Sequence, residues 1–413
     1  MALGSTGTSS NNALLVVHCD GPLGPERVTR SLDRFLDVCP WPAARLRRPF
    51  PWGKLHWAAG RRAALAPPPV RRHTVGTSPG FHEAVERELN AAIDPRREAP
   101  LRFLILDGAA GSVLVMTWFH PLMDPRGAQN LLHHLSDVEE HPHGAPWGAA
   151  VPAFTRPPET RSFAERGRLA RQSLEYMRHV SRGPAVAARV GGAGPVRFRH
   201  ARFVERDAGA SRDRATHDIA WRLAIVGKAM HAVRARRGVP ATPFLLPIAV
   251  DLRPKGEPGP SFGNMLAFHF ARFGPADTGD LPRLAGALRT QITEAVREGQ
   301  IDANEVAMDF LQYRPDWMVR RAVRSISGGD TFSFNCADVG DVPAALGRCF
   351  GRRVVNAYHV PAVPPRPGLG VFFNRCAGVE NLVVAWIDGA LSEDDVTRSV
   401  EVIREEMGWL EAP

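Results

Sequence analysis

The sequence contains no uninterrupted apolar run of about 18 residues, the length that a transmembrane helix needs. We therefore expect no membrane span. The first twelve residues, MALGSTGTSSNN, contain neither a basic segment nor an apolar segment, and a secretory signal peptide needs both. We expect residues 1–12 to form a disordered tail.

Cysteine is scarce and irregularly spaced. The five cysteines form an odd set, and the sequence contains no CxxC pair. This pattern argues against a disulfide scaffold and against a zinc knuckle. It fits a protein of the reducing cytoplasm, which is the location that we expect.

Lysine is nearly absent, since Lys54, Lys228 and Lys255 are the only lysines among 52 basic residues. The net charge is nevertheless +9. The arginines are scattered and form no basic stripe interleaved with aromatic residues, which a nucleic-acid surface needs. We predict no nucleic-acid binding. We expect the positive charge to attract phosphate-bearing small molecules or an acidic carrier protein.

Several familiar catalytic motifs are missing or defective. The chain has no Walker loop, no GxGxxG and no HExxH. GxSxG occurs once, at residues 76–80, but Pro79 follows the serine. A nucleophile elbow uses the backbone N–H of that residue for its oxyanion hole, and proline has none. The histidines at 133–134 and 141–143 lack partner spacing for a metal, so we predict no metal site.

Both halves of the chain mix helices with strands. Apolar periodicity predicts strands at residues 13–18, 100–106, 112–119, 243–254, 264–273, 331–335, 371–376 and 381–388. It predicts helices at residues 24–40, 81–93, 127–135, 163–180, 216–233, 281–296 and 391–407. The chain is longer than one hydrophobic core usually serves.

We therefore expect an α/β (α+β) protein of two lobes with mixed sheets. Residues 13–180 would form the N-terminal lobe, with a polar, Pro- and Gly-rich surface linker at 137–165. Residues 195–413 would form the C-terminal lobe, after a second break, GGAGP, at 191–195.

The stretch WFHPLMDPRG, residues 118–127, places His120 and Asp124 at the end of an apolar run. On one interpretation Asp124 is the N-cap of a helix with Pro125 at its first position, and its carboxylate accepts the Gly127 N–H. His120 is then an ordinary loop histidine. On the other, the strand end holds His120 as a general base, because the pKa of histidine lies near neutral pH. Both can hold, since a capping aspartate can also pair with an arginine that braces the loop.

At this point the sequence resembles a known family. HPLMDPRG resembles the HHxxxDG motif of the chloramphenicol-acetyltransferase-like superfamily, which includes nonribosomal peptide condensation domains and wax ester synthases. IAVDLRP…FGNMLAFHF resembles the family's strand–arginine–Gly-Asn stretch, and FSFNCADVG resembles its Ser-Asn-x-Gly region. The predicted strands 100–106 and 112–119 resemble the family's hairpin that leads to the motif histidine. The closing segment 381–408 also fits the family pattern. These landmarks occur in family order over roughly residues 13–410.

The sequence departs from the family pattern at three places. Phe119 replaces the first histidine of the motif, and Pro125 replaces the glycine after the aspartate. The Asn-Asp pair of wax ester synthases is His217-Asp218 here, which argues against a wax ester synthase.

The resemblance implies two lobes with an active-site tunnel between them, and acyl transfer from a thioester to a hydroxyl or amine of a small-molecule acceptor. The donor would be acyl-coenzyme A or the phosphopantetheine arm of an acyl- or peptidyl-carrier protein. No metal or other cofactor is implied. We expect a free-standing enzyme of natural-product or lipid metabolism.

The resemblance also implies site residues. His120 would be the general base and Asp124 a structural brace. Asn335 and Ser333 would donate hydrogen bonds to the oxyanion, and the alternation of TFSFN places both on one face of a strand. The residues expected to bind substrate are Phe119, Asn264 and Arg253. Arg253 would also pair with Asp124.

Two other functions stay open. One is a non-catalytic protein of the same fold that binds a carrier protein, which the departures at Phe119 and Pro125 motivate. The other is a condensation-like cyclase or hydrolase, in which an internal nucleophile or water replaces the acceptor.

Overall fold

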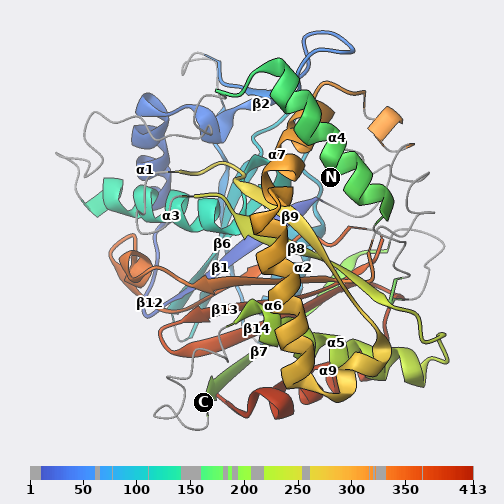
Figure 1. Cartoon of the computed structure of the whole chain (residues 1–413). Helices are drawn as coiled ribbons and strands as arrows, with labels where there is room; N and C mark the ends of the chain where they lie inside the picture. Colours follow the sequence, from blue (N-terminus) through green and yellow to red (C-terminus); the bar gives the residue numbers. More distant parts are fainter. Residues whose placement is uncertain are drawn as a thin grey trace.

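Two mixed sheets form the two lobes of the computed structural model (Figure 1). The structure describes residues 11–60, 66–76, 78–109, 111–140, 160–179, 185–187, 194–205, 218–253, 261–315, 317–319, 321, 332–364 and 366–412. None of the helices in these ranges is long and apolar enough to cross a membrane.

The first lobe contains a six-stranded sheet with the order β11-β12-β1-β6-β5-β4. Its strands are β1 (Asn12–Cys19), β4 (Val70–Thr74), β5 (Leu101–Gly108), β6 (Gly111–Phe119), β11 (Arg348–Cys349) and β12 (Arg352–Val360). The helices of this part are α1 (Pro25–Val38), α2 (Ser78–Asn90) and α3 (Pro125–Glu140). Helices α1 and α3 lie side by side on one face of the sheet (Figure 1).

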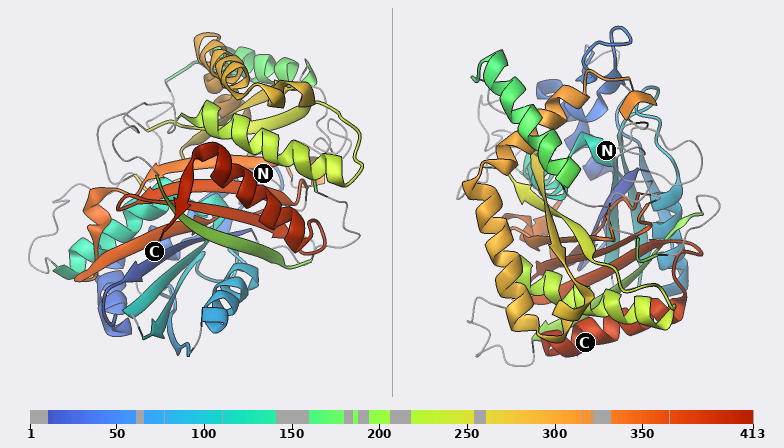
Figure 2. Two further views of the ribbon diagram at one scale, coloured as in Figure 1. Left: turned by 90° about the horizontal axis from the view of Figure 1, so that it is seen from below. Right: turned by 45° about the vertical axis from the view of Figure 1, so that its right-hand side comes forward.

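The second lobe contains a five-stranded sheet with the order β10-β13-β14-β7-β15 (Figure 2). Its strands are β7 (Val196–Glu205), β10 (Asn335–Asp341), β13 (Leu369–Cys376), β14 (Val379–Ile387) and β15 (Trp409–Glu411). Two short sheets pair β2 (Arg45–Arg47) with β3 (His56–Ala58) and β8 (Phe244–Asp251) with β9 (Leu266–Phe273). The described residues also form the helices α4 (Phe163–His179), α5 (Ile219–Arg236), α6 (Leu281–Arg297), α7 (Gln300–Leu311) and α9 (Glu393–Met407).

Strand β1 explains why its sequence, NALLVVHC, is apolar almost throughout. Alternate side chains of a strand point to opposite faces of the sheet. Leu15 and Val17 pack with α1 and α3, whereas Leu14 and Val16 join a larger core that includes strands of the second sheet. Strand β1, in the interior of the first sheet, is therefore buried on both faces, and a strand covered on both faces needs no polar side.

The lobes are not continuous in sequence. Strand β12 pairs with β1, so residues 348–360 complete the first sheet although they lie in the predicted C-terminal lobe. Helix α4 lies in the predicted N-terminal lobe but packs on α7. A local sequence pattern shows that a strand or helix exists, but it does not show which distant partner covers it.

Three local expectations need correction. Asn12 belongs to β1 and is fully buried, so the predicted tail is too long at its end, and residues 1–10 lie outside the described residues. Helices α3 and α4 extend into both ends of the predicted linker 137–165, of which residues 141–159 are not described. The strand predicted at 331–335 begins only at Asn335.

Buried histidines should make the fold sensitive to acid. Burial lowers the pKa of His359 to about 3 and that of His269 to about 4. Since their folded-state pKa values lie below the unfolded value of about 6.5, the unfolded chain binds more protons between these limits. The free energy of unfolding should therefore fall as the pH drops from about 6.5 towards about 4.

Chemical denaturation across this pH range tests this expectation. His359→Gln should reduce the slope of stability against pH by up to about 1.4 kcal/mol per pH unit. The control is His73→Gln, at an exposed histidine of β4, which should keep the wild-type slope. An unchanged slope in His359→Gln would contradict the assignment.

Candidate active site

A rigid turn follows strand β6, and we call residues 120–124 the corner. The strand ends at Phe119, and His120 begins a single 3-10 turn. The backbone N–H of His120 donates to the carbonyl oxygen of Asn11 at 2.8 Å. The indole Nε1 of Trp118 donates to the carbonyl oxygen of Met123 at 2.8 Å. Backbone and side-chain contacts thus fix the turn that carries His120.

Asp124 is the N-cap of α3 and is fully buried. Its Oδ1 accepts the Gly127 N–H at 2.8 Å. Its Oδ2 accepts the Met265 N–H at 2.8 Å and a hydrogen bond from Arg253 Nη1 at 3.0 Å. The predicted cap and the predicted pairing with Arg253 are both confirmed, and the carboxylate joins the corner to the start of β9.

Arg253 extends this brace. Its Nη2 donates to the carbonyl oxygen of Gly263 at 2.9 Å, and its Nη1 also lies 3.0 Å from Asp251 Oδ1. The side chain of Arg253 is 9% exposed. These contacts assign Arg253 to the architecture of the corner, and its expected contact with substrate stays a prediction.

The environment of His120 favours the neutral imidazole. Burial lowers its pKa, while its own backbone carbonyl and the Asp124 carboxylate oppose that shift. Within the described residues, Nδ1 is buried and has no hydrogen-bond partner of standard geometry. The three hydrogen bonds of Asp124 go to other groups, so the pair is no Asp–His dyad. A neutral histidine can accept a proton, as a general base must.

The two oxyanion candidates have different surroundings. Ser333 is fully buried, and its Oγ accepts the Leu245 N–H at 3.0 Å and a contact from Arg234 Nη2 at 3.4 Å. This hydroxyl therefore ties the segment before β10 to β8, which favours a structural role. Asn335 is partly exposed at the first position of β10, and its predicted role is untested.

Phe119 and Asn264 also differ in their surroundings. Phe119 is 6% exposed and packs in a small apolar cluster with Leu46, Leu55 and Ile93. A phenylalanine at the first position of the motif thus fills a core site. Asn264 is partly exposed and lies between Gly263 and Met265, both of which contact the brace. Binding of substrate by either residue stays a prediction.

The sequence did not single out Gly127 as a packing constraint. A Cβ atom at this position would lie 2.1 Å from the carbonyl oxygen of Phe262. The first turn of α3 thus touches the backbone of the segment that precedes β9, and only glycine allows this approach.

Gly127→Ala should therefore lower the free energy of unfolding by about 1–3 kcal/mol, because backbone has to move. The matched control is Gly286→Ala in α6, where an added Cβ meets nothing within 4 Å. That variant should be as stable as the wild type or more so, by up to about 1 kcal/mol. Equal stability of Gly127→Ala and wild type, measured by denaturant unfolding, would refute the close approach.

Among the described residues, no group of three or more His, Cys, Asp or Glu side chains is placed to hold a metal ion.

The chain matches no protein-family model and no sequence of a curated protein. Comparison of the structure with solved structures, however, finds the same fold in several proteins. The first condensation domain of the calcium-dependent antibiotic synthetase superposes with a TM-score of 0.69 at 12% identity, over 97% of this chain and 92% of that chain.

The protein has the condensation-domain fold. Trichothecene 15-O-acetyltransferase from Fusarium sporotrichioides shares the fold, with a TM-score of 0.66 at 10% identity over 98% of this chain and 96% of that one. The epimerization domain from the third module of tyrocidine synthetase B superposes with a TM-score of 0.59 at 11% identity, over 96% and 91% of the two chains. The predicted fold class is confirmed. Since these proteins are named for different reactions, the fold alone does not identify the reaction of this protein.

Proposed function

We propose that the protein is an acyltransferase that moves an acyl group from a thioester donor to a hydroxyl or amine acceptor. The observation that carries this proposal is the corner of His120 and Asp124. It presents a partly buried histidine, whose pKa is lowered by burial, at the end of a rigid strand, and the carboxylate nearby is fully engaged in bracing. Condensation domains and an acetyltransferase with this fold support the same class of reaction.

The proposed mechanism needs only proton transfer and charge stabilisation. The acceptor oxygen or nitrogen attacks the thioester carbonyl carbon as its proton passes to His120. Since Nδ1 is buried, Nε2 is the nitrogen that receives this proton. The carbon–sulfur bond of the resulting tetrahedral intermediate breaks, and the leaving thiolate takes up the proton from His120 Nε2, which restores the neutral base. The Asn335 side-chain amide is the candidate donor to the oxyanion.

The net charge is compatible with the donor class that the family resemblance implies. Coenzyme A carries phosphates, and carrier proteins of the phosphopantetheine type are acidic, so both would be attracted by a chain with a net charge of +9. We propose that the donor is one of these two. The tunnel between the lobes through which its arm would pass is part of the same proposal.

A donor panel tests the function. Purified protein is given acyl-coenzyme A or acyl-carrier-protein thioesters with and without mixed alcohols and amines, and free thiol and product mass are measured. Thiol release that depends on the acceptor, with a product of matching mass, is the expected result. Release without an acceptor would instead indicate hydrolysis or cyclisation. Binding of a carrier protein without release from any donor would favour the non-catalytic alternative.

A further inference from the structure

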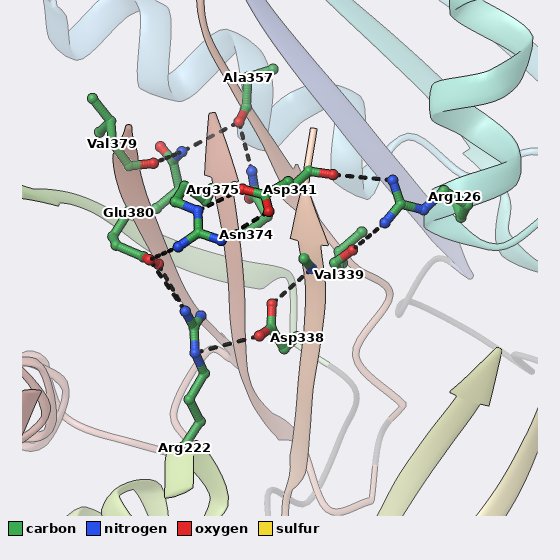
Figure 3. Close-up of polar contacts among 12 residues, drawn as sticks. Arg126, Arg222, Asp338, Val339, Asp341, Ala357, Asn374, Arg375, Val379 and Glu380 are labelled. Carbon is green, nitrogen blue, oxygen red and sulfur yellow. Dashed lines mark hydrogen bonds and ion pairs between the residues drawn. The ribbon is translucent and has the colours of Figure 1, made fainter. Parts of the chain in front are cut away.

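The first turn of α3 carries a second set of contacts, two residues beyond Asp124. Arg126 Nη1 donates to the carbonyl oxygen of Asp341 at 3.0 Å, and its Nη2 donates to the carbonyl oxygen of Val339 at 3.0 Å. The same Nη1 lies 3.0 Å from Oε1 of Gln129. Helix α3 packs on the first sheet, whereas β10 belongs to the second, so Arg126 joins the two lobes (Figure 3).

The end of β10 is shaped for this contact. Asp338 pairs with Phe373 and Asp341 with Arg375, so β10 has one residue more than β13 between these pairs, which is a β-bulge. Gly340 lies in the bulge with φ +76°, and an added Cβ would lie 3.6 Å from Arg126 Nη2. The bulge presents two carbonyl groups to one planar guanidinium. Arginine suits this geometry better than lysine, because its N–H donors have a fixed planar arrangement.

The carboxylates of Asp338 and Asp341, on either side of the bulge, are bound by arginines of the second lobe. Arg375 donates to both carboxylate oxygens of Asp341, at 2.5 and 2.8 Å. Arg222 of α5 lies 3.4 Å from Asp338 and 3.1 Å from the buried Glu380 (Figure 3). The second lobe thus fixes the bulge through its carboxylates, while α3 binds its carbonyls. We call Arg126, Val339, Gly340 and Asp341 the interlobe clamp.

The position of Arg126 in the helix is costly by itself. A cation in the first turn of a helix interacts unfavourably with the helix dipole. Its three acceptor oxygens offset this cost.

Asn335 stands at the other end of β10, four residues before Val339, or about 13 Å along a strand. The segment just before Asn335 is tied to β8 through Ser333, so β10 is anchored at both ends.

We propose that Arg126 is a positioning residue for the acyl transfer. Through the interlobe clamp it sets β10, and with it Asn335, relative to the corner of His120 and Asp124. This inference rests on the proposed function. Misplacement of a reacting group by about 1 Å can cost about 10²-fold in rate, so loss of the clamp should reduce kcat while substrate binding elsewhere is kept.

Three variants and one control test the clamp. Arg126→Gln removes the guanidinium, and Arg126→Lys replaces its planar fork by an ammonium group that lacks the fixed geometry for both carbonyls. Gly340→Ala disturbs the β10 side of the contact, because Gly340 has a φ of +76° that alanine rarely adopts. The control is Arg27→Gln, since Arg27 also stands in the first turn of a helix that begins with proline, and its Nη1 donates to the Phe350 carbonyl at 2.7 Å.

Amide hydrogen exchange and steady-state kinetics are measured on each variant. Arg126→Gln and Gly340→Ala should exchange faster over residues 335–341 and lose about 10²-fold in kcat with KM unchanged. Arg126→Lys should fall between them and wild type, and Arg27→Gln should match wild type in both measurements.

Unchanged exchange over β10 in Arg126→Gln would overturn the clamp. Unchanged kcat with faster exchange would overturn its positioning role, as would an equal loss of kcat in Arg27→Gln. Failure of the proposed function gives another pattern, since wild type itself would then transfer no acyl group. In that case the role of Arg126 in the reaction falls with the function, although exchange still reports its contact with β10.

Discussion

His120→Ala is expected to lower kcat/KM for acyl transfer by about 10²–10⁴-fold, the usual contribution of a general base. The variant should remain folded. Backbone contacts hold the turn, and the Nδ1 atom of the side chain makes no hydrogen bond of standard geometry with the described residues. The measurement is thiol release from the donor that the wild type uses, at saturating acceptor, together with thermal unfolding.

The control for this substitution is His73→Ala, at an exposed histidine of β4. It should keep wild-type turnover and stability. Equal turnover in His120→Ala and wild type would show that the corner is only a strand that leads into a capped helix. A variant that fails to fold would be replaced by His120→Gln, which keeps a polar side chain of similar length.

Asp124→Ala is expected to lower the free energy of unfolding by about 3–5 kcal/mol, as the removal of one partner from a buried ion pair does. Among the described residues, the substitution leaves the buried guanidinium of Arg253 with Asp251 as its remaining anionic partner. It also removes the acceptor for the Gly127 and Met265 N–H groups. Transfer activity should fall as well, because the corner that carries His120 loses its brace.

Two further variants decide the reason for this loss. Asp124→Asn keeps one acceptor oxygen and should lie between Asp124→Ala and wild type in stability. Asp20→Ala removes the partner of Arg353 in an exposed ion pair, and it should leave denaturant unfolding unchanged because exposed pairs contribute little. Wild-type stability of Asp124→Ala would show that the buried network does not hold the fold together.

The local part of the site could be predicted from the sequence. The Asp124 cap depends on four successive positions, from Asp124 to Gly127, and on the chemistry of a helix N-terminus, so WFHPLMDPRG contains all that it needs. The partner of Asp124 lies 129 residues away. Arg253 is identifiable from the sequence only because the segment around it resembles a family in which the order of landmarks is known.

The rest of the site depends on contacts between distant segments. Ser333 and Asn335 alternate in the sequence, but the strand begins only at Asn335, and the fold buries Ser333 against β8. Arg126 looks like any exposed arginine of a helix start until the bulge of β10 is placed beside it. Likewise, no pattern in residues 352–360 indicates that β12 pairs with β1. Such pairings are set by packing of the whole chain.

The most direct test of the account is the dependence of kcat/KM on pH, measured with the donor and acceptor that the wild type uses. Because kcat/KM reports the pKa of the essential base in the free enzyme, and burial lowers the pKa of His120, activity should hold at neutral pH. It should fall only below about pH 6.5, the ordinary pKa of histidine. An acid limb above that value, or the same limb in the residual activity of His120→Ala, would contradict the assignment of His120 as the general base.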